Sequence, residues 1–401
     1  MDKSKQRLDW EDLTLLIPYG RQDISREDIN AVVEVLKSDF LTQGEIVPQF
    51  EKCLSNYTGA KHSVVVNSAT SALHIACKAL EVGPGDLVWT SPVTFVASAN
   101  CAIYCGATID FIDIDPETYN LSIESLTQKL ELASSTGTLP KVLIPVHLSG
   151  QSCDMKSIYA LSKKYGFSIL EDASHAIGGK YLDKPIGNCQ YSDISVFSFH
   201  PVKIITSGEG GAALTNNPVL DKNMRLFASH GITRDIELME SKPEGPWYYE
   251  QISLGSNYRM TELQAALGLN QMSRIDNFIE KRHQIAKRYN SELKHLPIIL
   301  PAQADKIFSS FHLYIIRLKL DEIKKSHKNI FEELRHEGLG VNLHYIPVYR
   351  HPFYKKQGFK AQHFPEAEKY YAEAISIPIY FGLSDEQQEE VINIISKVLN
   401  K

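Results

Sequence analysis

The sequence has little cysteine and no long apolar run. Its 401 residues include six cysteines, which form no C-x-x-C pair and have no histidine pair beside them at zinc-like spacing, so no metal site is expected. Sparse cysteine is typical of a reducing compartment. The apolar run at 142–146 is far shorter than the roughly 20 residues of a membrane-spanning helix, and the polar residues 1–14 do not resemble a secretory signal. These absences predict a cytoplasmic protein without a membrane partner.

An excess of positive charge is also absent. The chain has 42 Lys and Arg against 48 Asp and Glu, a formal net charge of −6, so we do not expect it to bind nucleic acid. Hydrophobic residues make up 43% and charged residues 22% of the sequence, which indicates a folded globular protein. No G-x-G-x-x-G motif follows the first expected strand, which argues against a nicotinamide dehydrogenase.

Short β-rich runs alternate with helical patterns from about residue 60 to residue 215. The expected strands are 62–66, 87–90, 108–112, 141–145, 168–170, 194–199 and 211–215. Between them, the spacing of apolar residues predicts helices at 70–80, 123–132 and 155–164. This alternation predicts an α/β fold with a mostly parallel seven-stranded sheet covered on both faces. Such sheets place their ligand sites at the carboxyl ends of the strands.

The pattern changes after residue 230. The expected elements are helices at 260–272 and 275–293, a strand near 311–318, a helix near 321–337, strands near 341–343 and 376–379, and a last helix at 384–399. Strands and helices mixed in this way predict a smaller C-terminal α+β domain. The predicted division is an N-terminal segment 1–24, a large domain 25–273 and a small domain 274–401.

Three groups that could carry chemistry follow expected strands. Asp172 ends the run 168–172, which would place its carboxylate at the catalytic edge of the sheet. Lys203 stands between a strand and a glycine-rich turn, where partial burial would lower its pKa and favour the neutral amine that Schiff-base chemistry requires. Residues 67–70 end a strand and open a helix, whose free N–H groups and dipole would suit a phosphate.

Each of these features also has an ordinary structural explanation. Asp172 could cap a helix, Thr70 could do the same, and Lys203 could be a solvated surface residue. His175 and Phe95 could be core residues. Together, however, a phosphate cradle, a carboxylate and a lysine are the three groups that pyridoxal 5′-phosphate requires. An aromatic side chain such as Phe95 could stack on the ring of that cofactor.

The chain resembles the DegT-type, pyridoxal-phosphate-dependent sugar aminotransferases over nearly its full length. The matching segments are IPYG at 17–20, LTQG at 41–44, NSATSAL at 67–73, SPVTFVA at 91–97, HLSG at 147–150, EDASH at 171–175, SFHPVK at 198–203, GSNYRM at 255–260 and HYIP at 344–347. The resemblance implies the aspartate-aminotransferase type of fold (PLP fold type I), pyridoxal or pyridoxamine phosphate as cofactor, and a homodimer with shared active sites.

The resemblance also implies roles for individual residues. Lys203 would hold the cofactor and act as general acid and base, and Asp172 would bind the pyridine nitrogen with His175 nearby. The other implied cofactor contacts are Ala69, Thr70 and Ser198 at the phosphate, Phe95 on the ring, and Asn257 from the neighbouring subunit. The implied substrate contacts are Arg259 from the neighbour, His344 and Tyr345.

Segments 17–23, 41–44 and 147–151 are most similar to the branch of the family that serves pseudaminic acid biosynthesis. That branch implies amino transfer from L-glutamate to C4 of a UDP-linked 4-keto-6-deoxy-N-acetyl hexose. A dehydratase branch carries His at the position of Lys203, so transamination is the implied reaction. Two alternatives stay open: an aminotransferase for a different nucleotide keto-sugar, and a non-catalytic regulatory protein that binds the cofactor, for which no DNA-binding extension is visible.

Overall fold

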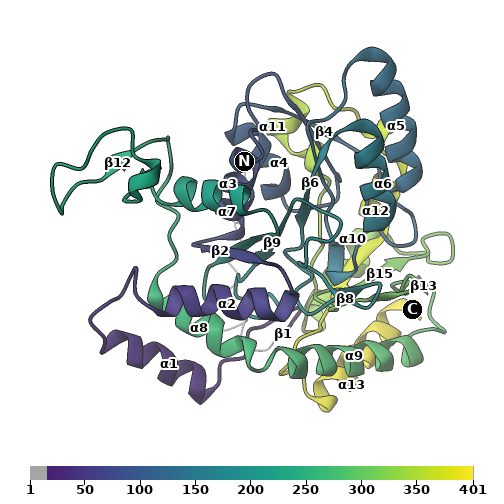
Figure 1. Cartoon of the computed structure of the whole chain (residues 1–401). Helices are drawn as coiled ribbons and strands as arrows, with labels where there is room; N and C mark the ends of the chain where they lie inside the picture. Colours follow the sequence, from purple (N-terminus) through teal and green to yellow (C-terminus); the bar gives the residue numbers. More distant parts are fainter. Residues whose placement is uncertain (1–15, 401) are drawn as a thin grey trace, which may run out of the picture.

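A seven-stranded sheet forms the centre of the larger part of the computed structural model, which describes residues 16–400 (Figure 1). Its strand order is β2-β10-β9-β6-β5-β3-β4. Strand β10 runs antiparallel to both β2 and β9, and the other neighbours are parallel, which confirms the predicted α/β class. The strands are β2 (His62–Val66), β3 (Leu87–Thr90), β4 (Thr108–Phe111), β5 (Val142–Ile144), β6 (Ser168–Asp172), β9 (Ile194–Ser198) and β10 (Gly211–Thr215).

Helices cover both faces of this sheet because neighbouring strand residues point in opposite directions. Val64 and Val66 pack into one core with helices α3 (Ala69–Ala79), α4 (Ala97–Tyr104) and α7 (Pro218–Ala228). Val65, between them, packs on the other face with α2 (Ile46–Thr58) and α8 (Glu262–Met272). The elements that complete these two faces are α1 (Arg26–Leu36), packed on α8, and α5 (Ile123–Thr136) and α6 (Met155–Tyr165), packed under β5 and β6.

A second apolar core lies in the C-terminal part of the chain. It is built from the antiparallel sheet β13-β15-β17 and three helices. Ile17, from the start of the described chain, also packs into this core. The elements are α9 (Ile275–Glu292), β13 (Ile298–Ile299), β15 (Tyr314–Leu318), α10 (His327–His336), β17 (Ala374–Ile377) and α13 (Asp385–Leu399). The predicted division between residues 273 and 274 falls between α8 and α9 and stays a prediction. Residues 1–15 of the predicted N-terminal segment lie outside the described residues.

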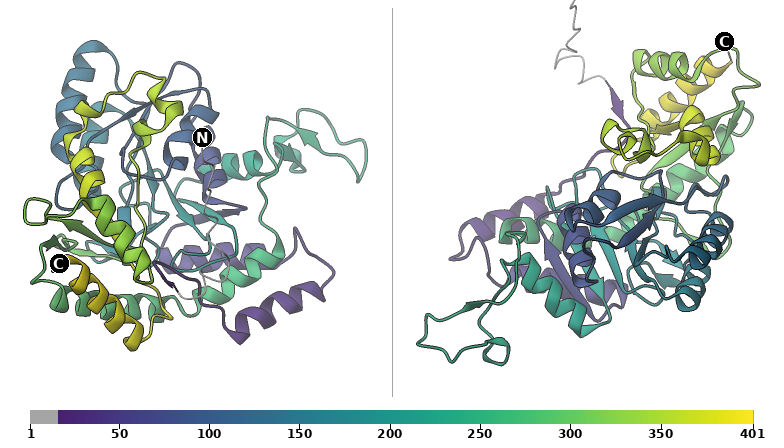
Figure 2. Two further views of the ribbon diagram at one scale, coloured as in Figure 1. Left: turned by 180° about the vertical axis from the view of Figure 1, so that it is seen from behind. Right: turned by 90° about the horizontal axis from the view of Figure 1, so that it is seen from above.

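The remaining elements are short. Residues 232–256 form an arm that projects from the body of the molecule (Figures 1 and 2) and contains β11 (Ile232–Thr233), η3 (Ile236–Leu238) and β12 (Glu250–Gln251). The others are β1 (Ile17–Pro18), β7 (Lys180–Tyr181), β8 (Lys184–Pro185), β14 (Ile307–Phe308), β16 (Leu339–Gly340), η2 (Leu148–Gly150), η4 (Val348–Arg350), α11 (Pro352–Lys355), η5 (Ala361–His363) and α12 (Pro365–Glu373). Between residues 16 and 400, no helix has the length and apolar character to cross a membrane.

Two sequence expectations about the C-terminal part were wrong. No strand forms at 341–343: β16 ends at Gly340 and pairs with β1, and Asn342 makes only an isolated bridge with Ser376. The helix expected near 321–337 is shorter, because Ser326 caps it and α10 begins at His327. Helix α4 was not predicted at all, since its apolar residues are not confined to one face and give no helical period.

Candidate active site

Asp172 and Lys203 follow neighbouring parallel strands. Asp172 is the last residue of β6, and Lys203 lies in the loop after β9, the strand next to β6 in the sheet. The carboxyl ends of parallel strands meet at one edge of a sheet, so the two side chains belong to the same site. Asp172 therefore ends a strand and does not cap a helix.

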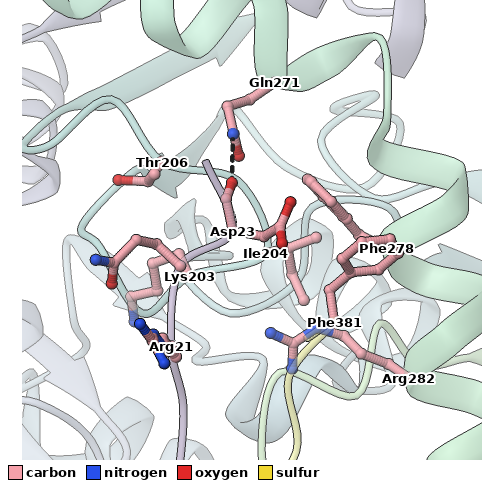
Figure 3. Close-up of a pocket in the computed structure, with 10 residues that line it drawn as sticks. Arg21, Asp23, Lys203, Ile204, Thr206, Gln271, Phe278, Arg282 and Phe381 are labelled. Carbon is pink, nitrogen blue, oxygen red and sulfur yellow. Dashed lines mark hydrogen bonds between the residues drawn. The ribbon is translucent and has the colours of Figure 1, made fainter. Parts of the chain in front are cut away.

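Burial changes the protonation of Lys203. It lowers the pKa of the amine to about 8 from the usual 10.5, although the negative charge of Asp172 acts in the opposite direction. Lys203 lines a small cavity together with Arg21, Gln271 and Arg282 (Figure 3). A substantial fraction of the amine is therefore neutral near pH 7.5, and Lys203 is not an ordinary solvated lysine.

The carboxylate of Asp172 is buried and hydrogen-bonded at both oxygens. The Ser174 N–H donates to Oδ1 at 3.1 Å, and the Ser98 hydroxyl lies 2.6 Å from Oδ2. Ser98 was not identified from the sequence, although it stands one residue beyond the matching segment at 91–97. The carboxylate consequently has a fixed orientation.

The start of helix α3 offers backbone donors to an anion. Ala69 and Thr70 occupy the first helical positions, where backbone N–H groups have no intrahelical acceptor. Gly211 lies directly opposite: a Cβ on it would come within 2.5 Å of the Ala69 nitrogen. Ser198, buried, pairs in the sheet with Gly211, the residue that approaches the helix start. These N–H and O–H groups, with the helix dipole, fit a phosphate.

Three aromatic side chains, His175, Tyr345 and His312, pack together near Lys203. The Ser149 N–H donates to His175 Nδ1 at 3.3 Å, so Nε2 carries the ring proton and donates to the Tyr345 hydroxyl at 3.0 Å. The His312 ring lies 4.4 Å from that of His175. Burial, together with the positive charge of Lys203, holds the pKa of His175 well below its usual range, so its imidazole is neutral.

His344 is also an uncharged side chain. Burial, followed by the charge of Lys203, lowers the pKa of His344 to about 3, and its Nδ1 lies 2.8 Å from the Ser376 hydroxyl. A neutral imidazole cannot provide a positive charge for an anionic substrate. Its ring packs 5.0 Å from that of Tyr345.

Phe95 is not part of the core. Its side chain is 58% exposed, so the core explanation for this residue was wrong. Its ring centroid lies 6.2 Å from that of Tyr345. A free aromatic face at this position is available for stacking on a planar ligand.

Asn257 and Arg259 belong to a segment that pairs with the end of β2: Arg259 forms a bridge with Val66, and the Asn67 N–H donates to the Tyr258 carbonyl. Asn257 is exposed and forms a bridge with Ser229, and Arg259 donates from Nη1 to the Ser229 hydroxyl at 3.0 Å. Arg259 lines a separate cavity of about 340 Å³ together with Arg225, and this cavity does not include Lys203. The structure thus brings Lys203, Asp172 and His175 together, and it shows no contact of Asn257 or Arg259 with Lys203 among the described residues.

No metal-binding cluster accompanies this site: residues 16–400 contain no group of three or more His, Cys, Asp or Glu arranged to hold an ion. The site combines an amine that is readily deprotonated, a buried carboxylate and a phosphate cradle. These groups fit pyridoxal phosphate at its aldehyde, ring nitrogen and phosphate.

Comparisons with known proteins agree with this geometry. The family model of the DegT/DnrJ/EryC1/StrS aminotransferases matches residues 22–396. Spore coat polysaccharide biosynthesis protein SpsC of Bacillus subtilis is 39% identical, covering 96% of this chain and 97% of that protein. The UDP-4-amino-4,6-dideoxy-N-acetyl-β-L-altrosamine transaminase of Campylobacter jejuni is 36% identical, covering 96% of this chain and 98% of that enzyme.

Solved structures show the same fold. Helicobacter pylori PseC, an aminotransferase involved in the biosynthesis of pseudoaminic acid, has a TM-score of 0.88 and 32% identity, covering 96% of this chain and 99% of that one. A putative sugar aminotransferase from Streptococcus pneumoniae has a TM-score of 0.86 in its pyridoxamine phosphate form and 0.85 in its pyridoxal phosphate form, at 31% identity, with 96% and 99% of the two chains covered. The chain therefore belongs to the DegT/DnrJ/EryC1/StrS family and is a pyridoxal-phosphate-dependent sugar aminotransferase.

Proposed function

We propose that this protein transfers the amino group of L-glutamate to C4 of a UDP-linked 4-keto-6-deoxy-N-acetyl hexose in pseudaminic acid biosynthesis. The observation that carries the proposal is the half-buried Lys203, with a pKa of about 8, in the loop after the strand next to the one that ends at Asp172. Similarity to the Campylobacter transaminase and to Helicobacter PseC supports the choice of sugar.

In this proposal Lys203 holds the cofactor and moves the proton. When bound, pyridoxal phosphate acts as an electron sink for charge that develops at the α-carbon of the donor. The neutral amine of Lys203 takes the proton from the α-carbon of glutamate and later delivers a proton to C4 of the sugar. A pKa of about 8 suits both steps, because the amine changes protonation state close to working pH.

Other side chains orient the reactants. Asp172 would accept a hydrogen bond from the ring nitrogen and keep it protonated, while the N–H groups of Ala69 and Thr70 and the Ser198 hydroxyl would bind the phosphate. The neutral His175 positions the Tyr345 hydroxyl through the 3.0 Å hydrogen bond between them. Phe95, whose side chain is exposed, would stack on the cofactor ring.

The proposal includes a homodimer with shared active sites. Helix α1 exposes Ile29, Val33 and Leu36, and the projecting arm exposes Trp247 and Leu254. Large apolar side chains exposed on neighbouring turns are typical of a surface covered by another subunit.

Asn257 and Arg259 follow the arm, and Arg259 lines a cavity that does not include the Lys203 of its own chain. In a dimer they would serve the neighbour's cofactor phosphate and substrate, respectively. The UDP diphosphate requires positive charge, which Arg259 from the neighbour and Arg21 beside Lys203 would supply.

The test is direct synthesis. Purified protein loaded with pyridoxal phosphate is incubated with L-glutamate and UDP-linked 4-keto-6-deoxy-N-acetyl hexoses of both C5 configurations, and products are identified by NMR. We expect one C4-amino sugar and an equal amount of 2-oxoglutarate. Transfer only to other nucleotide keto-sugars would favour the second candidate, an aminotransferase for a different nucleotide keto-sugar. The 39% identity to SpsC, a spore coat polysaccharide biosynthesis protein, is consistent with that alternative. Cofactor binding without transfer to any acceptor would favour the regulatory alternative.

A further inference from the structure

We propose that Ser98, supported by Thr94, is a positioning residue for Asp172: the two hydroxyls fix the carboxylate so that it keeps the ring nitrogen of the cofactor protonated. This inference rests on the proposed role of Asp172. It adds Ser98 and Thr94 to the proposed site, which so far comprised the lysine, the carboxylate and the phosphate-binding residues.

The two oxygens of Asp172 are held by different elements. Ser98 belongs to the first turn of α4 and its Oγ lies 2.6 Å from Oδ2, while the Ser174 N–H reaches Oδ1 from the segment after β6. Ser98 is fully buried. The carboxylate cannot rotate about its Cβ–Cγ bond without losing at least one of these contacts.

The hydrogen bonds between Thr94, Ser98 and Asp172 have a definite donor at each step. Ser98 has one proton, and its Oγ lies near Asp172 Oδ2 at 2.6 Å, the Thr94 hydroxyl at 2.7 Å and the Phe95 carbonyl at 3.3 Å. An ionised carboxylate oxygen has no proton to give, so Ser98 donates to it and Thr94 donates to Ser98. The result is a chain of two hydroxyls that ends on the carboxylate.

Water cannot replace this chain. Thr94 and Ser98 are 2% and 0% exposed, and Asp172 is 5% exposed. A hydrogen bond to a charged group in such a place is roughly twice as strong as a neutral one, and its loss leaves the carboxylate oxygen without a substitute partner. Removing the Ser98 hydroxyl therefore weakens the hold of Asp172 on the protonated ring nitrogen.

The protein also offers a matched control variant for Ser98→Ala. Ser195, on β9, is also fully buried, but its hydroxyl has no hydrogen-bond partner among the described residues. Ser195→Ala removes the same atom from an equally buried position without breaking a hydrogen bond. Thr94→Val removes the donor to Ser98 and leaves the contact between Ser98 and Asp172 in place.

The experiment uses full-length protein loaded with pyridoxal phosphate labelled with ¹⁵N at the ring nitrogen. The ¹⁵N chemical shift reports protonation of that nitrogen, and a fluorescence titration gives the cofactor dissociation constant. For Ser98→Ala we expect a shift toward the unprotonated value and a dissociation constant about tenfold higher. Thr94→Val should move both in the same direction by less, and Ser195→Ala should change neither.

Asp172→Asn distinguishes the inferred role of Ser98 from the proposed role of Asp172. If it moves the ¹⁵N resonance while Ser98→Ala and Thr94→Val leave it unchanged, the inference about Ser98 is overturned and the role of Asp172 stands. If Asp172→Asn leaves the resonance unchanged as well, both are overturned. Should Ser98→Ala not fold, Thr94→Val alone decides: an unchanged resonance and affinity refute the inference.

Discussion

Replacing Lys203 with methionine should stabilise the cofactor-free protein at pH 7. Burial lowers the pKa of this amine to about 8, whereas an exposed lysine has 10.5. At pH 7 the folded protein therefore carries an ammonium group in an environment that disfavours it, and unfolding releases that group to water. The difference between the two pKa values corresponds to about 3 kcal/mol, which is the upper limit of the gain from removing the charge.

The effect has a defined pH dependence. Because the pKa of Lys203 is lower in the folded state, the unfolded chain binds more protons between pH 8 and 10.5, and the wild type gains stability as the pH rises through this window. Methionine has no proton to bind. The difference in unfolding free energy between the variant and the wild type should thus be largest below pH 8 and disappear near pH 10.5.

Urea unfolding of both cofactor-free proteins at pH 7, 9 and 10.5 measures this difference. Lys222→Met, at an exposed position on α7, is the control and should show no pH-dependent change. A Lys203→Met protein that is no more stable than the wild type at pH 7, or whose advantage does not shrink with rising pH, would refute the reasoning.

Three further outcomes are expected. Asp172→Asn removes a charge that raises the pKa of Lys203, so the pH at which the free amine reacts half-maximally with a small aldehyde should fall below about 8; an unmoved midpoint contradicts this. Mixing Lys203→Ala and Asn257→Ala subunits should restore about a quarter of wild-type activity, because half of the dimers would contain one intact site; no recovery argues against shared sites. The contact with the Cys77 thiol, with His74 nearby, lowers the pKa of Cys105 to about 5. Peptide mapping should therefore find Cys105 alkylated by iodoacetamide at pH 6, more slowly in Cys77→Ala; equal labelling rates would show that Cys77 has no effect.

The pairing of Lys203 with Asp172 could be predicted because it depends on sheet topology. Two strands that alternate with helices are parallel, so residues at their carboxyl ends meet at one edge without knowledge of side-chain packing. The helix start at Ala69 was predictable for a similar reason, since it follows directly from a strand and a capping serine.

The contacts between distant segments could not be predicted in this way. Ser98 reaches Asp172 across 74 positions of sequence, through a helix whose apolar residues give no amphipathic pattern. The exposure of Phe95 was missed because an apolar run normally indicates burial. The neutral state of His344 depends on burial and on the charge of Lys203, neither of which a local motif contains.

The identity of the lysine that holds pyridoxal phosphate can be measured directly. Borohydride reduction of the loaded protein fixes the cofactor to its lysine, and mass spectrometry of the peptides locates it. The phosphopyridoxyl group is predicted on Lys203 in the wild type and on no lysine in Lys203→Ala. Label on a different lysine of the wild type, or unchanged labelling of Lys203→Ala, would contradict the proposed active site.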